Sequence, residues 1–347
     1  MKPGSDTANL SVLGYDPKVY YSGRSPLEAL SIGVPMKDTD IAIRCNIVTI
    51  SEEDVPFEEK TIIDHSSSEI STEDCAVLLK AVMDELANET YQFYVGTSYR
   101  HCLIWDKGEV VELTPPHDVL GRVIKEYLPT DKALYEMMKK SYDLLNNHPI
   151  NIERRKNGKR PANSVWFWGE GTAPRLQSFE EKFGLKGSII SAVDLLKGIA
   201  TCAGMNRPCV DGATGYIDTN FDGKLDAALK EIDGDRDFVY IHIEAPDECG
   251  HRGELQNKIR AIELIDEKIL TPLVNHLEKL GDYALLICPD HPTPIAIKTH
   301  SSEPVPYLIY KSYDQKDSGV EIFNEKNALS TGIMVEHGYE LITRLLK

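Results

Sequence analysis

Short apolar runs alternate with helix-periodic segments over the C-terminal half of the chain. The runs are rich in Val, Ile, Leu and Tyr, and the strands that they predict span residues 187–191, 238–245, 283–288 and 305–310. Amphipathic helices are predicted between and after them, at residues 194–203, 222–232 and 255–279 and after Gly338. This alternation predicts a parallel α/β sheet, which we expect to extend back to Val165.

The pattern changes between about residues 40 and 151. Strand-like segments of a mixed or antiparallel sheet are predicted at residues 41–50, 61–64, 92–95 and 101–105. A helix that starts at Ser71 and covers residues 72–87 interrupts them. We therefore expect an inserted α+β domain at residues 39–151, within a discontinuous α/β domain formed by residues 1–38 and 152–347.

Composition narrows the class of protein. The 347 residues are 41% hydrophobic and 27% charged, which is typical of a soluble globular protein. The sequence has neither an export signal nor an apolar run of membrane-spanning length, so we expect a cytoplasmic protein without a membrane partner. A net charge of −17 argues against a nucleic-acid partner, and seven widely spaced cysteines argue against a disulfide framework.

Carboxylate and imidazole side chains follow the predicted strands. They form three groups, Asp247 with His251, Asp290 with His291, and His300 alone. Strand carboxyl ends line the ligand crevice of an open α/β sheet, so we expect the five side chains to converge. A lone Asp-x-x-x-His is more often a helix-surface feature and a lone Asp-His a capped turn, but together the groups predict a divalent metal site. Oxygen and nitrogen ligands suit Mn, Mg or Zn, and two metals suit phosphoryl chemistry.

Ser5 stands at a predicted helix start, in the segment Gly4-Ser5-Asp6-Thr7-Ala8. Serine at such a position is most often an N-cap. The same position presents free backbone N–H groups to an anion, so that a serine there can also carry a phosphoryl group. From these residues alone, both interpretations stay open.

Several blocks of the sequence closely resemble the archaeal-type 2,3-bisphosphoglycerate-independent phosphoglycerate mutases of the alkaline phosphatase superfamily. The resemblance covers essentially the whole chain. The blocks are GSDTANLSVLGYDPKVYYSGRSPLEAL (4–30), NSVWFWGEG (163–171), FEEKFGLKGSIISAVDLLKGIA (179–200), GATGYIDTN (212–220), EAPDECGHRG (244–253), and CPDHPTP with KTHSSEPVP (288–306).

The resemblance implies an alkaline-phosphatase-like parallel-sheet domain, two divalent metal ions and a phosphorylated serine, Ser5. Manganese is the expected metal, with zinc, cobalt or magnesium as alternatives, and no 2,3-bisphosphoglycerate is required. Asp247, His251 and His300 would bind one metal, whereas Asp290 and His291 would bind the other together with Ser5. Phosphate would pass from the 3-hydroxyl of glycerate to Ser5 and back to the 2-hydroxyl. The inserted domain would close over the site and exclude water.

Phosphoglycerate would also need contacts from side chains outside the metal centre. Arginine suits bidentate binding of carboxylate or phosphate, although Arg and His beside strands commonly pair with structural carboxylates. The expected substrate-binding residues are Arg44, Asp64, Arg100, His101, His117, Asp118, Arg122 and Lys197.

Members of the family begin with a strand that ends in Asp-Gly, whereas this sequence begins at Met1-Lys2-Pro3-Gly4. The family's aspartate ligand to the serine-bearing metal is then missing, and we expect the chain as written to be weakly active or inactive. Rival functions within the same fold are a homoserine kinase and a metal-dependent phosphomonoesterase. A non-catalytic binding or structural fragment is the alternative from another class. The sequence does not indicate the oligomeric state.

Overall fold

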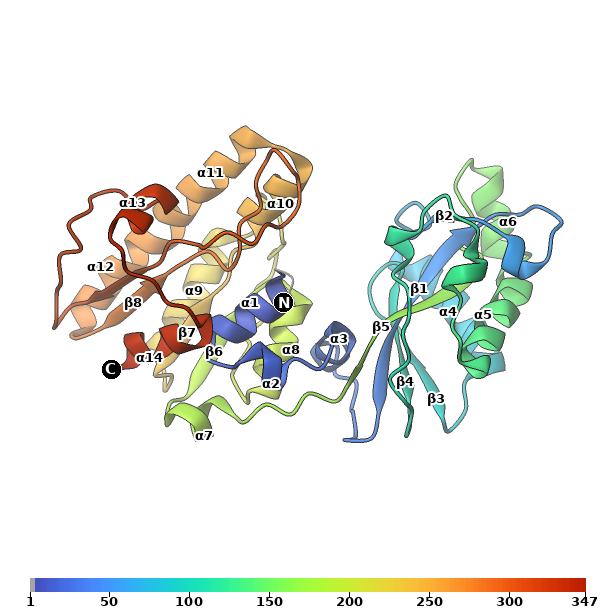
Figure 1. Cartoon of the computed structure of the whole chain (residues 1–347), viewed down its shortest axis with the longest axis horizontal. Helices are drawn as coiled ribbons and strands as arrows, with labels where there is room; N and C mark the ends of the chain where they lie inside the picture. Colours follow the sequence, from blue (N-terminus) through green and yellow to red (C-terminus); the bar gives the residue numbers. More distant parts are fainter. Residues whose placement is uncertain (1–3) are drawn as a thin grey trace. The chain divides into compact units, whose positions relative to one another are not determined.

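The computed structural model describes residues 4–347, which form two compact units (Figure 1). Unit 1 comprises residues 4–21 and 175–347, and unit 2 comprises Ser22–Pro174. The expected boundaries near residues 38 and 151 fall within unit 2. Residues 1–3, with which the truncation hypothesis begins, lie outside the described part of the chain. The closing function of the inserted domain stays a prediction.

The centre of unit 2 is the strand β1 (Ile41–Ile50), in which every residue is buried. β1 pairs antiparallel with three strands, with Cys45 opposite His101 on one edge and opposite Phe167 on the other. The other strands of this sheet are β2 (Ile62–Asp64), β3 (Tyr91–Tyr94), β4 (Arg100–Trp105) and β5 (Ser164–Thr172). The predicted antiparallel strands of this segment are thus present.

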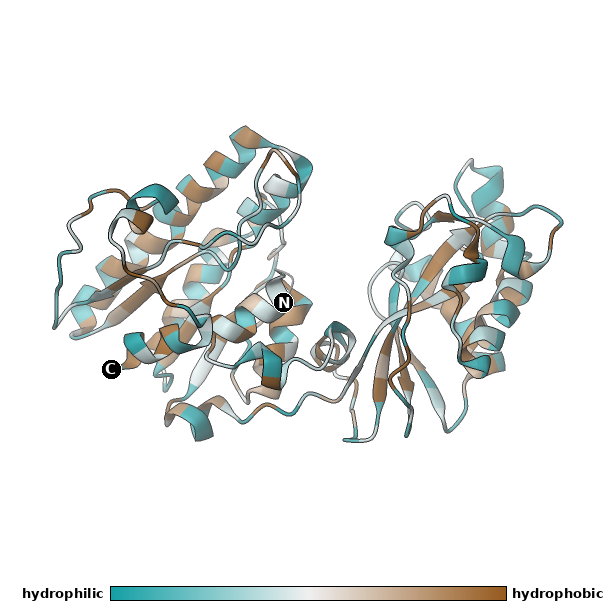
Figure 2. Ribbon diagram, viewed as in Figure 1, coloured by the Kyte–Doolittle hydropathy of each residue, from teal (hydrophilic) through white to brown (hydrophobic). Residues whose placement is uncertain are grey.

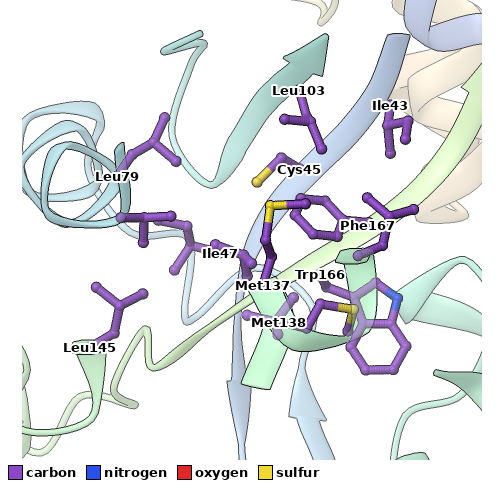
Figure 3. Close-up of a cluster of buried hydrophobic side chains, with 14 of the residues drawn as sticks. Ile43, Cys45, Ile47, Leu79, Leu103, Met137, Met138, Leu145, Trp166 and Phe167 are labelled. Carbon is purple, nitrogen blue, oxygen red and sulfur yellow. The ribbon is translucent and has the colours of Figure 1, made fainter. Parts of the chain in front are cut away.

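Helices pack against this sheet and close the hydrophobic core of unit 2 (Figure 3). Cys45 and Ile47 of β1 lie among Met138, Trp166 and Phe167, all of them buried. The helices of unit 2 are α3 (Arg24–Ser31), α4 (Thr72–Leu86), α5 (Lys132–Leu145) and α6 (Pro149–Lys156), with short 3-10 turns at Phe57–Glu59, Pro116–Asp118 and Ile124–Tyr127. Ser71 caps α4 by accepting a hydrogen bond from the backbone N–H of Asp74, as its sequence predicted.

One strand belongs to a different sheet from the one expected. We expected the parallel sheet to extend back to Val165, but β5 runs antiparallel beside β1 in unit 2. The reason is packing, because Trp166 and Phe167 enter the same core as β1 and α5. An apolar run alone does not show which sheet will bury it.

Unit 1 contains two small sheets and a larger number of helices. Its strands are β6 (Gly187–Ile190), β7 (Phe238–Ile241), β8 (Ala284–Ile287) and β9 (Leu308–Lys311). Its helices are α1 (Ser5–Val12), α2 (Pro17–Tyr20), α7 (Phe179–Phe183), α8 (Asp194–Cys202), α9 (Phe221–Ile232), α10 (Ala245–Arg252), α11 (Leu255–Ile265), α12 (Thr271–Leu280), α13 (Glu325–Ser330) and α14 (Leu341–Leu346). A π-helical turn, Asp266–Leu270, joins α11 to α12, and a 3-10 turn, Gly338–Glu340, precedes α14.

The expected parallel sheet of unit 1 is formed only in part. β6 and β7 pair in parallel, whereas β8 and β9 pair antiparallel. Parallel strands need a crossover connection, usually a helix. Residues 288–307 between β8 and β9 contain no helix, so β9 returns antiparallel. The fold is therefore a mixed α/β fold with small, mostly antiparallel sheets.

The helices of unit 1 follow the predicted amphipathic pattern (Figure 2). Hydrophilic and hydrophobic residues alternate along α11 and α12, and Ile269 and Leu273 pack on Phe221 and Leu225 of α9. No helix within residues 4–347 combines the length and the apolar composition that a membrane crossing requires.

Candidate metal centre

Two structural segments of unit 1 carry the five predicted metal ligands. Asp247 and His251 lie four residues apart on α10, so both side chains project from the same face of the helix. The strand before them ends at Ile241, four residues earlier than the apolar run suggested. Asp290, His291 and His300 lie in the loop that follows β8. As predicted, Asp290, His291 and His300 follow a strand, β8. Asp247 was expected just after a strand end but lies on the helix α10.

Asp247, His251 and His300 converge on one point. Nε2 of His251 lies 3.0 Å from Nε2 of His300 and 3.4 Å from Oδ2 of Asp247. Nε2 of His300 lies 3.5 Å from Oδ1 of Asp247. Ligand atoms bound tetrahedrally to one ion at about 2.1 Å stand roughly 3.4 Å apart, so these spacings fit a shared divalent cation.

The backbone orients one of these imidazoles. Nδ1 of His251 lies 3.1 Å from the carbonyl oxygen of Lys298. A carbonyl can only accept, so Nδ1 is the donor in this contact and Nε2 is the ring nitrogen that faces Asp247 and His300. Such a hydrogen bond on the far nitrogen is typical of metal-binding histidines.

Ser5 lies beside the other predicted pair of ligands. Its Oγ is 3.1 Å from Nε2 of His291, which in turn is 3.5 Å from Oδ2 of Asp290. Gly4, not Ser5, is the N-cap of α1, and Ser5 is the first helical residue. The interpretation of Ser5 as a cap is therefore wrong, because its hydroxyl is directed toward the Asp290–His291 pair instead of the helix backbone.

Thr293 joins the two groups of ligands. Its hydroxyl donates a hydrogen bond to Oδ1 of Asp247 and lies 3.4 Å from Nδ1 of His291. The rings of His291 and His300 lie 3.8 Å apart, and Asp247, His291 and His300 also present ligand atoms within 4.8 Å of one another. Asp247 and His300 thus also lie near His291 of the other candidate set, and the whole site is continuous.

The donor set suits a hard or borderline cation. Carboxylate and imidazole groups face the centre, and the neighbouring thiol of Cys288 is not a thiolate, because burial raises its pKa to about 12. These carboxylate and imidazole groups fit a divalent metal such as Mn, Mg or Zn.

Gly250 lets α10 approach the loop that carries His291. A Cβ at Gly250 would lie 2.6 Å from the carbonyl oxygen of Thr293.

Two buried groups beside the centre were missed by the sequence reasoning. Burial lowers the pKa of His242 to about 4, which keeps its ring neutral, and Nδ1 lies 3.2 Å from Oγ of Ser191. Lys224 is 1% exposed and donates to the carbonyl oxygen of His242 at 3.2 Å. Burial lowers the pKa of Lys224 to about 8, an effect that nearby Glu244 opposes. A signal was present, because Lys224 stands on the apolar stripe of α9 between Phe221 and Leu225.

Two of the expected substrate-binding residues meet in unit 2 around the Trp168 ring. The guanidinium of Arg44 lies 4.1 Å from the centre of that ring and pairs with Glu28 at 3.0 Å. The ring of His117 lies 5.1 Å from Trp168 and 6.1 Å from His65. Nδ1 of His65 is buried and has no hydrogen-bond partner within the described chain. The group thus combines the positive charge of Arg44 with a buried ring nitrogen of His65 that lacks a partner within the described chain.

Asp64 and His101 make hydrogen bonds within unit 2, and their role in binding substrate stays a prediction. Asp64 accepts hydrogen bonds from the backbone N–H groups of Ser66 and Ser68 and from Arg160. Burial alone would raise its pKa, but these bonds lower it to about 2. His101 is buried, with Nδ1 accepting from the backbone of Gly96 and Nε2 lying 3.1 Å from Sγ of Cys75. Both side chains hold local structure together.

The remaining expected substrate-binding residues make other contacts. The guanidinium of Arg100 lies 4.9 Å from the ring centre of Tyr99, and Arg122 donates to the hydroxyl of Tyr127. Asp118 lies 3.7 Å from His117. Lys197, in unit 1, pairs with Asp194 at 3.1 Å. Their role in binding substrate stays a prediction.

Comparison with known proteins identifies close relatives of the chain. Residues 1–151 match the family model for 2,3-bisphosphoglycerate-independent phosphoglycerate mutase. The enzyme of that name from Methanosarcina barkeri is 46% identical over 350 residues, which cover 99% of this chain and 86% of the relative. The enzyme from Methanosarcina acetivorans is 44% identical over 351 residues, with the same coverage.

Solved structures agree with these sequence relatives. A protein from Pyrococcus horikoshii is 28% identical with a TM-score of 0.78, over 99% of this chain and 83% of that one. The cofactor-independent phosphoglycerate mutase from Thermoplasma acidophilum is 26% identical with a TM-score of 0.63, over 100% of this chain and 87% of that one.

Proposed function

Because the chain belongs to the family of 2,3-bisphosphoglycerate-independent phosphoglycerate mutases, we propose that it uses Ser5 as the phosphoryl carrier. The chain is an isomerase that interconverts 3-phosphoglycerate and 2-phosphoglycerate. The observation that carries the proposal is the position of Ser5 Oγ, 3.1 Å from Nε2 of His291. No other donor for the phosphoryl group is needed, because the substrate itself supplies it.

The position of Ser5 suits a serine that becomes phosphorylated. As the first residue of α1, it stands where the helix dipole and the backbone N–H groups of the first turn favour a dianion. Asn9, one turn further, donates to the carbonyl oxygen of Ser5 at 2.8 Å and fixes this turn. The phosphoserine would therefore form at a backbone that is already ordered.

Two sets of side chains would hold the metal ions. Asp247, His251 and His300 form one set, and Asp290 and His291 form the other with Ser5. When bound, divalent cations lower the pKa of a hydroxyl ligand and balance the charge of phosphoryl oxygens. Manganese is our expected ion, and two ions are our expected number.

The reaction consists of two balanced transfers. In the first, the Ser5 Oγ–phosphorus bond forms as the bond from phosphorus to O3 of glycerate breaks, and the proton lost by Oγ returns to O3. In the second, O2 of the retained glycerate attacks the phosphoserine, and Oγ regains a proton from O2. Water must be excluded in between, because its attack would release free phosphate.

Lys224 supplies a fixed positive charge near the site. With a pKa of about 8, it is mostly protonated at neutral pH although it is buried. Buried charge is costly unless it meets an opposite charge. We assign to Lys224 the stabilisation of the phosphoryl dianion during transfer.

Side chains outside the metal centre would contact the glycerate part of the substrate. Arg44 and His117 are the strongest candidates, since both lie against Trp168, and His117 lies near His65, whose Nδ1 has no hydrogen-bond partner among residues 4–347. Arg100, Asp118, Arg122 and Lys197 remain proposed contacts on chemical grounds alone. We further propose that unit 1 is an alkaline-phosphatase-like domain, which the parallel pairing of β6 with β7 supports.

A coupled assay for conversion of 3-phosphoglycerate to 2-phosphoglycerate, with Mn²⁺ and without 2,3-bisphosphoglycerate, tests the proposal. Turnover by the wild type and its loss in Ser5→Ala supports it. Turnover that survives Ser5→Ala would contradict it. Release of free phosphate instead of 2-phosphoglycerate would identify a phosphomonoesterase, and phosphorylation of homoserine from ATP would identify a kinase.

A further inference from the structure

Asn9 links three parts of unit 1, namely α1, β7 and the loop after β8, that no backbone hydrogen bond joins directly within residues 4–347. Its side chain is fully buried on α1. Its Nδ2 donates to the carbonyl oxygen of Ser5 at 2.8 Å and to Oδ2 of Asp290 at 3.0 Å, and its Oδ1 accepts from the hydroxyl of Tyr240 at 2.6 Å. The amide thereby uses both of its donor hydrogens and its acceptor.

The two acceptors beside Asn9, the carbonyl oxygen of Ser5 and the carboxylate of Asp290, decide which end of the amide faces the metal centre. Tyr240 can donate here, and a flipped amide would turn its NH₂ group toward that hydroxyl and its oxygen toward the Asp290 carboxylate. Two acceptors would then face each other at Asp290, which is unfavourable in a buried site. Burial also raises the pKa of Tyr240 well above its ordinary value, so that the phenol keeps its proton. The observed orientation is therefore the one that directs a donor at Asp290.

The hydrogen bonds of Asn9 connect two separate sheets of unit 1. Tyr240 lies in β7, which the described chain pairs with β6, whereas Asp290 follows β8, which is paired with β9. The two small sheets thus meet at Asn9 through side chains. Ser5, one turn before Asn9, is held by the same amide.

We propose that Asn9, which Tyr240 holds through a hydrogen bond to Oδ1, is a positioning residue that sets Asp290 and the Ser5 turn for metal binding and phosphoryl transfer. The inference rests on the proposed function of Ser5 and Asp290. Residues that orient metal ligands typically contribute about 10–100-fold to metal affinity or activity. Loss of the single Tyr240 hydrogen bond is expected to cost about 3–10-fold.

Asn151 provides a matched control within the same chain. It is fully buried in unit 2, and its amide also makes three hydrogen bonds, donating to the carbonyl oxygens of Leu145 and Ala162 and accepting from the backbone of Ala162. Substitution of either asparagine by leucine removes a saturated buried amide. Only Asn9 touches the metal centre.

The test measures binding of Mn²⁺ alone to the purified full chain, by calorimetry or electron paramagnetic resonance, beside thermal stability without metal. We expect Asn9→Leu to weaken Mn²⁺ binding about 10–100-fold and Tyr240→Phe about 3–10-fold. Asn151→Leu should lower thermal stability and leave Mn²⁺ affinity unchanged. Wild-type Mn²⁺ affinity in both Tyr240→Phe and Asn9→Leu would overturn the inference.

Mutase assays separate this inference from the proposed function. If Ser5→Ala remains as active as the wild type, the phosphoserine proposal fails, while the comparison of Mn²⁺ affinities still decides the function of Asn9. If the proposal holds, Asn9→Leu should lower kcat more than it changes KM for 3-phosphoglycerate, because Asn9 is buried behind the ligands.

Discussion

Oγ of Ser5 lies 3.1 Å from Nε2 of His291, although 286 positions separate the two residues in the chain. The contact joins the start of α1 to the loop after β8. It gives the serine a basic neighbour and directs it toward the candidate ligands.

Thr293 should matter for metal binding more than for stability. Its hydroxyl donates to Asp247 and lies 3.4 Å from Nδ1 of His291, so it orients one ligand of each set. Thr293→Val keeps the shape and removes the hydroxyl. We expect Mn²⁺ affinity to fall by about 10-fold or more, with a small change in thermal stability. Thr293→Ser, which keeps the hydroxyl, is the control, and equal affinity of the Val and Ser variants would contradict this function.

Gly250 should not tolerate a side chain. A Cβ there would lie 2.6 Å from the carbonyl oxygen of Thr293 and 3.0 Å from Nζ of Lys258. Gly250→Ala must push α10 away from the loop that carries His291. We expect a loss of about 1–3 kcal/mol in the free energy of unfolding together with weaker metal binding. Gly234→Ala, at the end of α9 in unit 1, is a comparison in which metal binding should persist.

The buried charge of Lys224 is expected to lower the free energy of unfolding and to raise mutase activity. Its pKa falls from 10.5 to about 8 on folding, so the unfolded chain binds this proton more tightly than the folded one. The free energy of unfolding therefore rises with pH between 8 and 10.5, as the buried charge is lost. Lys224→Met should be more stable than the wild type below pH 8, by a margin that vanishes toward pH 10.5.

The same variant should lose most of its mutase activity if the charge of Lys224 stabilises the phosphoryl dianion as proposed. Urea unfolding across this pH range and kcat at neutral pH measure the two effects. A Lys224→Met variant with wild-type kcat would remove Lys224 from the site.

Asp64 should act as a structural residue. Hydrogen bonds from Ser66, Ser68 and Arg160 lower its pKa from 3.8 to about 2. Its stabilising effect is therefore fully present above pH 3.8 and is lost as the pH falls through 2. Asp64→Asn should lower the free energy of unfolding by about 1–3 kcal/mol at neutral pH, and the difference should shrink in acid. A normal stability with a raised KM for 3-phosphoglycerate would instead support the substrate-binding interpretation.

The sequence predicted the local elements better than their pairing. The strand at Ile41–Ile50 was predicted with its observed bounds, because its long apolar run is buried on both faces. The antiparallel pairing of β8 with β9 was not predicted, since it depends on the missing crossover helix. The position of β5 depends on which core buries Trp166, and this is a property of the tertiary structure.

For the candidate site, too, local features could be predicted from the sequence and tertiary contacts could not. Asp247 and His251 could be grouped because residues four apart on a helix share a face. Asp290, His291 and His300 could be added because they follow a predicted strand. Asn9, Tyr240 and Thr293 could not be found, because their significance lies in hydrogen bonds between distant segments. Lys224 could have been found, since a lysine on an apolar helix stripe is an unusual pattern.

Trapping the phosphoenzyme tests the central claim most directly. The full chain is mixed with Mn²⁺ and 3-phosphoglycerate, quenched in acid within the first turnovers, and digested for mass spectrometry. We predict phosphate on Ser5, formed at a rate that is at least kcat and absent from Ser5→Ala. Conversion of 3-phosphoglycerate to 2-phosphoglycerate at full rate without phosphate on Ser5 would contradict the account.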